Sequence, residues 1–395
     1  MTTERERLSG ANELSAILAR WGAPPAEPGT AAAVVACESE ADVRDVLRAA
    51  RSDGVQVVAA GARSRLGRMD LPATGERRIL LDMTACRGIL ALDADALWLR
   101  VRAGTPLAEA SRAAAERGLR LAGVGDADSG TAGGWLSMTA RIPDPLLGTP
   151  SPPALGLAVV FPDGASWRSI DVPRSACGPE LNALFYGTAG AFGVVTEATL
   201  RLVPPGAERQ RAVWHLLQPA SAAEMLRQMA LGPLPPVEAQ AILWVDGRGT
   251  RLHAVFEGAK GLVREALRDG QERARAAGAR ELRDAGDERI DPPAELPAAA
   301  VRWSQLDEVL SKLYLPAVDA LVLDRPEIAG CRLRLIGGDP AEQRMRLRRA
   351  LDGDGERARR RLAQFERLRR LKREWDPGAL LNPHALAWLE REATT

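Results

Sequence analysis

A helix, a glycine, a short apolar strand and a loop of small residues follow one another early in the sequence, and this order constrains the fold most. Ser39 is placed as the N-cap of the helix, and Asp42 stands where the second partner of a capping box belongs. Gly54 ends the helix, and the apolar run 55–59 predicts a strand. The loop 61–67 leaves that strand, so the sequence predicts mixed helix and sheet with a small-residue turn at a strand end.

The next part of the chain continues to alternate strands, helices and turns. Leu99 and Val101 alternate with arginines, which is the period of a half-buried strand. Thr105 and Pro106 are placed as the N-cap and first residue of a helix that ends near Gly118. The segment 123–134 is too poor in apolar periodicity to predict either element. Further strands are expected at 79–83, 157–161, 166–171 and 193–202.

From about residue 209 the pattern changes to strand, helix, two strands and helix, followed by further strands. This order is typical of a ferredoxin-like α+β sheet. A chain of 395 residues is long for one core, so two domains are the natural expectation. The expected strands are 212–217, 239–245, 251–256, 317–323 and 331–336, and the expected helices are 221–229 and 262–277.

An arginine-rich helix is expected within 344–373. Its apolar face repeats every three residues, at Leu362, Phe365, Leu368 and Leu371. The basic face of this helix is most typical of a solvent-exposed surface. The alternative is that it docks an acidic partner subunit. Nucleic acid is not an expected partner, because the rest of the chain balances the charge to a net +1.

Cysteines and histidines are few and scattered. No Cys-x-x-Cys occurs, so we expect the cysteines to be small buried apolar residues and the chain to carry no iron–sulfur cluster. The histidines lack metal-ligand spacing, so no metal is expected. These residues are Cys37, Cys86, Cys177, Cys331, His215, His253 and His384.

Neither a membrane span nor an export signal is expected. The longest apolar stretch, 154–161, is too short to cross a bilayer. The first residues, Met-Thr-Thr-Glu-Arg-Glu-Arg, include acids and no apolar segment, unlike a secretory signal. We therefore expect a cytoplasmic protein that does not insert into a membrane itself.

Two glycine-rich segments, Gly61–Gly67 and Gly130–Gly134, suit the binding of a diphosphate. Such a group needs several backbone N–H donors, and only small residues let the chain approach it closely. Arg63 and Arg65 would add positive charge to the first segment. Taken alone, the segments are more typical of ordinary surface turns. They match neither a Walker loop nor a Rossmann fingerprint, which argues against NAD as the cofactor.

Five segments, taken in order, resemble the FAD-binding domain of the vanillyl-alcohol oxidase/p-cresol methylhydroxylase (PCMH) family. They are 57–68, 103–109, 130–135, 184–200 and 375–383. Within this family the sequence is most similar to the FAD-binding subunits of bacterial glycolate oxidases. That likeness is found in Leu66-Gly67-Arg68, Gly104-Thr105-Pro106-Leu107 and the segment 258–264.

The resemblance implies an α+β fold made of a two-subdomain FAD-binding PCMH-type domain and a ferredoxin-like α+β cap domain, with a C-terminal segment that returns to the FAD domain. The implied limits are a helical extension at 1–30, the FAD-binding domain at 31–206, the cap or substrate domain at 207–374 and the C-terminal segment at 375–395.

The implied cofactor is FAD, bound non-covalently, because no histidine occupies the first loop to form a histidyl link. The two glycine-rich segments would hold its diphosphate. Ala59, Ala60 and Ala62 stand where the family is richer in glycine, and their methyl groups should weaken that binding. The implied cofactor residues are Gly61, Ala62, Arg63, Ser64, Gly67, Thr131, Gly133, Gly134, Gly193, Val194 and Asn382.

The implied function is that of the FAD-binding subunit of a 2-hydroxy-acid oxidase or dehydrogenase of the glycolate type. Electrons would pass from a small 2-hydroxy acid through FAD to a partner iron–sulfur subunit. A paralogous flavoprotein subunit would complete the complex, whose partners could hold it at the periphery of the inner membrane. Two alternatives stay open: a non-catalytic scaffold subunit, with or without FAD, and a standalone oxidase that uses oxygen.

No catalytic base is identified from the sequence. Oxidation of a 2-hydroxy acid needs a base for the hydroxyl proton and a cation for the carboxylate. His384 follows the closing Asn-Pro, and Arg302 precedes Trp303, so these two are the candidates. His384 is more typical of an exposed histidine at a helix start, and Arg302 is more typical of a surface ion pair.

Overall fold

The computed structural model describes residues 33–63, 78–124, 130–139, 142–143, 150–171, 180–232, 234–244, 249–282, 298–313, 318–327, 330–351 and 356–387. The expected extension at 1–30 and the predicted cofactor residues Ser64 and Gly67 lie outside them. The chain divides into two compact units. The first combines Met1–Pro204 with Leu362–Glu392, and the second is built from Pro205–Arg361.

A small parallel sheet begins the first unit, with the strand order β1-β3-β2. Helix α2 (Glu40–Ser52) packs against it, and the predicted capping box is confirmed. Ser39 Oγ accepts a hydrogen bond from the Asp42 N–H at 3.3 Å, and the Asp42 carboxylate accepts one from the Ser39 N–H at 2.9 Å. Because the strands are parallel, β2 and β3 end at the same edge of the sheet. The strands are β1 (Ala33–Ala36), β2 (Gln56–Ala60) and β3 (Arg78–Asp82).

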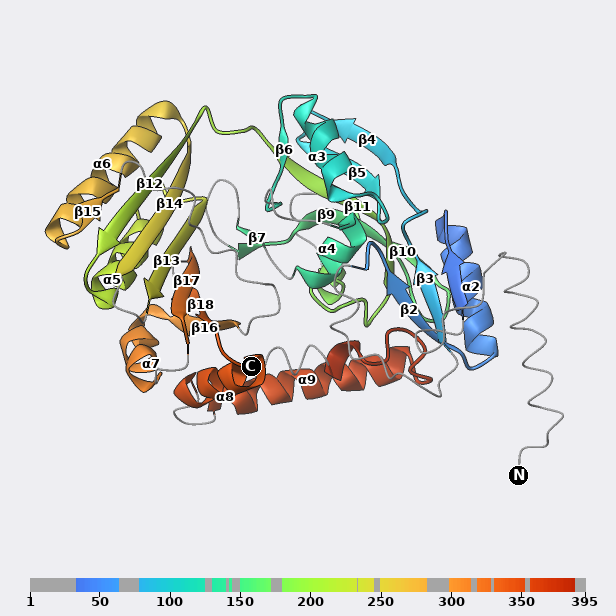
Figure 1. The fold of residues 1–395 in the computed structure, drawn as a ribbon. Coiled ribbons are helices and arrows are strands. Elements are labelled where there is room, and N and C mark those ends of the chain that lie inside the picture. The colour runs from blue at the N-terminus through green and yellow to red at the C-terminus, as the bar shows by residue number, and fades with distance from the viewer. Residues whose placement is uncertain are drawn as a thin grey trace. The chain divides into compact units, whose positions relative to one another are not determined.

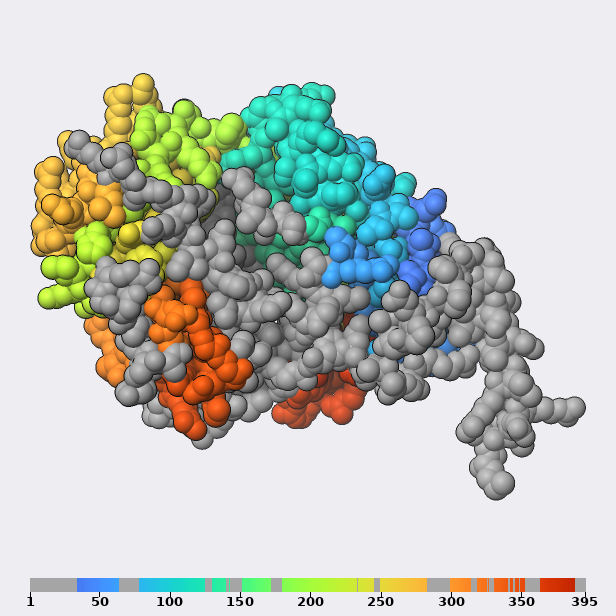
Figure 2. Space-filling view, viewed as in Figure 1, coloured from blue at the N-terminus to red at the C-terminus, as the bar shows by residue number. Residues whose placement is uncertain are grey.

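An antiparallel sheet forms the larger part of the first unit, in the order β10-β9-β11-β5-β4, with β6 paired to β11. Helices α3 and α4 pack on it (Figure 1), and the part of the chain around α3 forms the teal region of the surface in Figure 2. The elements are β4 (Ile89–Asp93), β5 (Trp98–Arg102), α3 (Leu107–Ala115), β6 (Arg120–Leu121), α4 (Ala132–Met138), β9 (Ala154–Val160), β10 (Ser166–Arg168), η2 (Leu181–Leu184) and β11 (Val194–Val203), beside the small pair β7 (Ile142–Pro143) and β8 (Pro150–Ser151).

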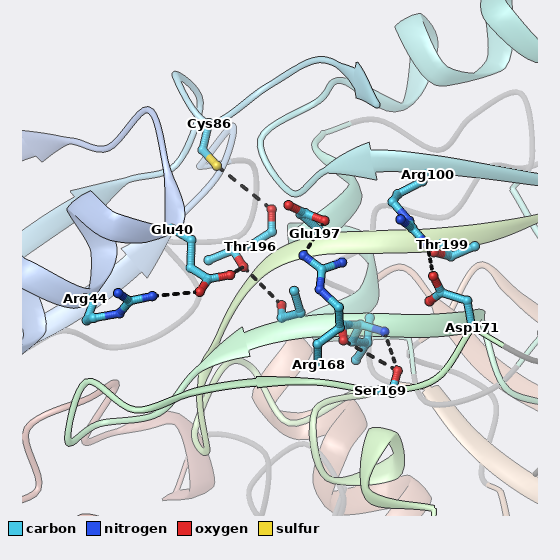
Figure 3. A network of polar contacts seen from close by, with 12 residues as sticks. Glu40, Arg44, Cys86, Arg100, Arg168, Ser169, Asp171, Thr196, Glu197 and Thr199 are labelled. Atoms are coloured by element: carbon cyan, nitrogen blue, oxygen red, sulfur yellow. Dashed lines mark hydrogen bonds and ion pairs between the residues drawn. The ribbon is translucent and has the colours of Figure 1, made fainter. Parts of the chain in front are cut away.

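Charged side chains on one face of this sheet form a network of ion pairs (Figure 3). Arg168 pairs with Glu197 at 2.7 Å, and Arg100 pairs with Asp171. Glu197 precedes the buried Ala198 on β11, so the charged face is opposite the apolar core. Exposed pairs of this kind contribute only about 0–1 kcal/mol each, so the apolar face decides the strand register.

The start of α3 differs from the sequence prediction. Thr105 is not its N-cap, because Pro106 occupies that position and makes no side-chain cap hydrogen bond. Thr105 is fully buried, and its hydroxyl accepts from the Gly88 N–H at 2.9 Å and donates to the Gly88 carbonyl at 3.2 Å. The hydroxyl thus ties the turn after β5 to the turn before β4, which no local pattern shows.

The segment expected to lack regular structure contains a helix start. Thr131 is the N-cap of α4, and its Oγ1 accepts a hydrogen bond from the Gly134 N–H at 3.3 Å. Trp135 and Leu136 are buried against the sheet and stabilise the helix. Two glycines in its first turn hide the apolar periodicity, because glycine carries no side chain to reveal a face.

The second unit is a seven-stranded antiparallel sheet in the order β15-β12-β14-β13-β17-β18-β16. Strand–helix–strand–strand–helix–strand order runs from β12 to β15, and three strands extend the sheet. Helices α5 and α6 pack on one face around the fully buried Trp214 (Figure 1). The elements are β12 (Glu208–Leu216), α5 (Pro219–Ala230), β13 (Glu238–Trp244), β14 (Thr250–Gly258), α6 (Lys260–Ala276), β15 (Arg280–Glu281), β16 (Ala298–Arg302), η3 (Trp303–Gln305), α7 (Leu306–Lys312), β17 (Ala320–Glu327), β18 (Gly330–Ile336) and α8 (Pro340–Leu351).

Helix α9 (Glu356–Trp375) contributes its later residues to the core of the first unit. Leu368 and Leu371, on the predicted apolar face, pack against this core. Trp375 meets the rings of Phe161 and Phe192 edge-on, at centroid distances of 5.4 and 6.1 Å. The helix therefore leads the chain back to the first unit. Within the described part of the chain, none of the helices combines the length and hydropathy that a membrane span requires.

Three of the four cysteines are described, and each is buried and free. Burial raises the pKa of the Cys37 and Cys331 thiols to about 12 and that of Cys86 to about 11. These thiols are small apolar core residues, as predicted, and are protonated and unreactive at neutral pH. Cys177 lies outside the described residues.

Candidate cofactor-binding site

An open pocket lies in the first unit, and most of its lining comes from four segments. These segments are the end of β2 with its following turn, the start of α4, the loop before β11 and the residues after α9. All of the predicted cofactor residues that the structure describes line it. They are Gly61, Ala62, Arg63, Thr131, Gly133, Gly134, Gly193, Val194 and Asn382.

The first wall is the turn after β2, at the carboxyl end of the parallel sheet. A Cβ atom at Gly61 would lie 2.1 Å from Thr131 Oγ1, so the absence of a side chain there lets this turn touch the start of α4. Arg63 has a left-handed backbone with φ of 58°. Its guanidinium Nη2 donates to Asp82 Oδ2 at 2.8 Å. The turn is thus fixed on both sides, by a packed glycine and by an ion pair.

Asp82 ends β3 beside this turn and is firmly held. Its Oδ1 accepts hydrogen bonds from the Thr84 N–H at 2.9 Å and the Thr84 hydroxyl at 2.7 Å. Burial by itself would raise the pKa of Asp82, but the bonds from Thr84 and the charge of Arg63 outweigh it and hold the pKa below its usual value of 3.8. Asp82 is therefore ionised at neutral pH.

In the second wall, at the start of α4, the backbone N–H groups form hydrogen bonds to other groups of the protein. The N–H groups of Ala132 and Gly133 donate to the carbonyls of Thr105 and Ala103, at 2.9 and 2.8 Å. Gly134 N–H bonds to its cap, as described above. A Cβ at Gly133 would lie 2.8 Å from the Ala103 Cβ. The glycine therefore serves close packing, and these N–H groups are not available to a ligand.

The third wall is the loop 187–193 before β11. Gly187, Ala189 and Gly190 all have positive φ, at 66°, 51° and 70°. The N–H groups of Gly187 and Ala189 donate to the carbonyls of Leu136 and Ser137, at 3.0 and 2.8 Å. This loop is therefore anchored to the end of α4, and these hydrogen bonds join the third wall to the second.

Asn382 joins the first and third walls. Its Oδ1 accepts from the Ala59 N–H at 3.1 Å, its Nδ2 donates to the Gly190 carbonyl at 3.0 Å, and its own N–H donates to the Val57 carbonyl at 2.8 Å. The side chain is nearly completely buried, at 4% exposed. Both ends of its amide are engaged, so Asn382 shapes the pocket by holding its walls.

A buried ion pair that sequence reasoning missed supports this arrangement. Lys372 Nζ donates to Asp376 Oδ2 at 2.6 Å and to the carbonyls of Ala191 and Leu381, at 2.5 and 2.6 Å. Asp376 in turn accepts from two backbone N–H groups of the closing segment. Burial lowers the pKa of Lys372, and the neighbouring Asp376 opposes that shift. The Lys-x-x-x-Asp spacing at a helix end was the available signal, and the surrounding arginines concealed it.

The described part of the pocket offers one cation to an anionic ligand and no side chain suited to act as a catalytic base. Among the described residues that line it, Arg63 is the only charged side chain, and none is aspartate, glutamate, histidine, cysteine or tyrosine. His384 is half-buried and Arg302 ends a strand of the second unit, and neither lines this pocket. His215 and His253 lie on β12 and β14 of that unit. The small residues and single positive charge fit the diphosphate of a dinucleotide.

Comparison with known proteins agrees with this geometry. The FAD binding domain family matches residues 31–168. Alkyldihydroxyacetonephosphate synthase of Caenorhabditis elegans is 27% identical over 175 residues, which are 43% of this chain and 29% of that protein. Glycolate oxidase subunit GlcE of Escherichia coli (strain K12) is 28% identical over 236 residues, 58% of this chain and 64% of that subunit. Each match thus spans less than two thirds of the relative's own length.

Solved structures of low sequence identity share the fold. The structure of p-cresol methylhydroxylase with substrate bound aligns with a TM-score of 0.69 at 13% identity, and the alignment covers 97% of both chains. At this identity the likeness establishes the fold alone. The matched FAD binding domain indicates FAD as the cofactor.

Proposed function

We propose that this chain is a flavoprotein with a PCMH-type FAD-binding domain and, more narrowly, the FAD-binding subunit of a 2-hydroxy-acid oxidase or dehydrogenase of the glycolate type. The observation that carries the proposal is the pocket, whose described lining comes mainly from four separate segments and includes one cation, Arg63. The relative that is a glycolate oxidase subunit supports the substrate class. A partner iron–sulfur subunit and a paralogous flavoprotein subunit are part of the proposal.

FAD would be held by the chain's own residues in distinct ways. The turn Gly61–Arg63 would face the diphosphate with its backbone and the Arg63 guanidinium. Gly134 and Thr131 would form the opposite wall, and the backbone at 193–194 would lie beside the rings. When bound, FAD supplies the capacity to accept a hydride from the hydroxyl-bearing carbon of the substrate. The protein's contribution at this pocket is binding and orientation.

Non-covalent binding of FAD belongs to the same proposal. A covalent link needs a side chain such as histidine, cysteine or tyrosine to bond the flavin. None of these lines the described part of the pocket. Acid precipitation of the purified protein should therefore leave the flavin in the supernatant. Yellow colour that stays with the precipitate after washing would contradict non-covalent binding.

A non-catalytic scaffold subunit is the second candidate. The observation that favours it is the absence of a base among the described residues that line the pocket. In that case a catalytic paralogue would carry out the oxidation, and this chain would stabilise the complex. The domain limits at 31–206 and 207–374, with a substrate domain in the second part, remain a proposal in either case.

A visible spectrum separates the two candidates. The purified chain, reconstituted with FAD, should show absorption bands near roughly 370 and 450 nm that are characteristic of the bound flavin. Anaerobic addition of glycolate or another 2-hydroxy acid should bleach the 450 nm band if the chain is catalytic. A spectrum that no 2-hydroxy acid changes would favour the scaffold. A colourless protein that takes up no added FAD would exclude the proposed flavin subunit.

A further inference from the structure

Arg63 stands apart from the other residues of the pocket. It is the only charged side chain among the described lining residues, and about 45% of its side chain is exposed. Its backbone is left-handed, with φ of 58°, a conformation that a side chain with a Cβ rarely adopts. Such conformations persist where the surrounding structure imposes them, and they cluster at ligand sites.

The partner of Arg63 is held independently of it. Asp82 Oδ1 is occupied by the Thr84 N–H and hydroxyl, while Oδ2 takes the Arg63 guanidinium at 2.8 Å. Asp82 is also the strand residue registered opposite Ala60, directly before the turn. The carboxylate is thus a fixed point at the pocket rim, and the arginine is the partner that can move.

The contact with Asp82 engages one end of the guanidinium. Nη2 of Arg63 donates to Asp82 Oδ2, and the carboxylate offsets the positive charge that would attract an anion. An arginine fork matches the oxygens of a diphosphate as well as those of a carboxylate. The Asp82 carboxylate therefore makes the same kind of contact with Arg63 that a diphosphate would make.

We propose that Asp82 acts as a counter-charge that competes with the cofactor diphosphate for Arg63 and so limits the affinity of the pocket for FAD. Without a bound ligand, the opposite charges of Arg63 and Asp82 offset each other. When a diphosphate enters, it draws the guanidinium away from a carboxylate that Thr84 keeps in place. Asp82 is a positioning residue in this scheme, since it acts on the ligand through Arg63. The inference rests on the proposed binding of FAD.

The test is an FAD titration, followed by flavin fluorescence, of the full chain and four variants. Asp82→Asn should bind FAD about three- to fivefold more tightly and with a steeper dependence on salt, because Arg63 is released. Arg63→Gln should bind about tenfold more weakly. In the Arg63→Gln background, Asp82→Asn should change affinity much less than it does alone. Asp95→Asn, an exposed change of equal charge outside the pocket lining, is the control and should leave affinity unchanged.

Riboflavin, which lacks the diphosphate, separates this competition from a general effect on the pocket. Its affinity should be the same in the wild type and in Asp82→Asn. The proposal is overturned if Asp82→Asn binds FAD no more tightly than wild type, or if riboflavin gains equally. Thermal unfolding checks that each variant is folded, and Asp82→Ser repeats the test if the asparagine variant is not. Absence of FAD binding by every protein, wild type included, would overturn the proposed function and this inference together.

Discussion

Two glycine-rich walls of one pocket use glycine for different purposes. At the start of α4 the backbone N–H groups are bound to carbonyls and to the Thr131 hydroxyl, and Gly133 lets the helix approach Ala103. In the turn after β2, the N–H groups of Gly61 and Ala62 donate to no other residue in the described part of the chain. Glycine content alone therefore does not reveal which segment binds a ligand. The hydrogen-bond partners of the backbone N–H groups decide which segment can bind a ligand.

The largest expected effect is on stability, at the α4 wall. Gly133→Ala would place a Cβ 2.8 Å from the Ala103 Cβ and 3.2 Å from its carbonyl oxygen. Ala103 is buried, so we expect the free energy of unfolding to fall by about 2–3 kcal/mol. Denaturant unfolding of the cofactor-free protein measures this.

Gly134→Ala is the matched control for that substitution. Its Cβ would meet only Thr131 Oγ1, at 3.2 Å. Because alanine has a higher helix propensity than glycine, the unfolding free energy should stay within about 1 kcal/mol of wild type. Equal losses in both variants would show that the α4 wall is not limited by its contact with Ala103.

The next effect is on affinity, at the turn after β2. Ala62 is exposed and lines the pocket, so Ala62→Glu would place a negative charge beside the diphosphate. We expect FAD to bind about tenfold more weakly, while the unfolding free energy changes by less than about 0.5 kcal/mol. Ala62→Gln, of the same size without the charge, is the control. A stability loss as large as that of Gly133→Ala would erase the distinction between the two walls.

A smaller effect is expected where the two walls touch. Thr131→Ala removes the hydroxyl that caps α4, which should lower the unfolding free energy by about 1 kcal/mol. Thr131→Ser keeps the hydroxyl and should retain most of that stability. Thermal unfolding of the two variants in parallel gives the comparison. If both lose the same amount, the methyl group rather than the cap is the stabilising part.

The smallest effect concerns pH and the Arg63–Asp82 pair. The pKa of Asp82 is lower in the folded protein than its usual 3.8, so the folded state binds this proton less readily than the unfolded state. The stabilisation is present above pH 3.8 and is lost as the pH falls through the folded-state pKa. Because Arg63 is half-exposed, it should amount to less than about 1 kcal/mol. The unfolding free energies of wild type and Asp82→Asn should therefore converge on acidification, and a constant gap would contradict the shift.

The sequence predicted elements that depend on local signals. The Ser39 capping box and Gly54 mark the two ends of one helix, and α2 lies between them as predicted. The residues that line the pocket could be anticipated because the ordered segments resemble a known family. The structural role of each residue could not be predicted, because it depends on partners that are distant in sequence. Asn382 accepts a hydrogen bond from the Ala59 N–H, and Lys372 donates one to the Ala191 carbonyl. Lys372 lies in a helix whose arginines indicate a solvated face, and only packing shows that this one cation is buried.

The position of Asn382 in the chain has a consequence for the order of events during synthesis. Domains generally fold as units, in the order in which they are made. Three walls of the pocket are translated before Pro204, but the residues that bind them together, Lys372, Asp376 and Asn382, follow the segment Pro205–Arg361 of the second unit. A nascent first unit would thus have an incomplete pocket. We therefore expect the cofactor to be held firmly only after Asn382 has joined these walls, so that flavin would be incorporated late in folding.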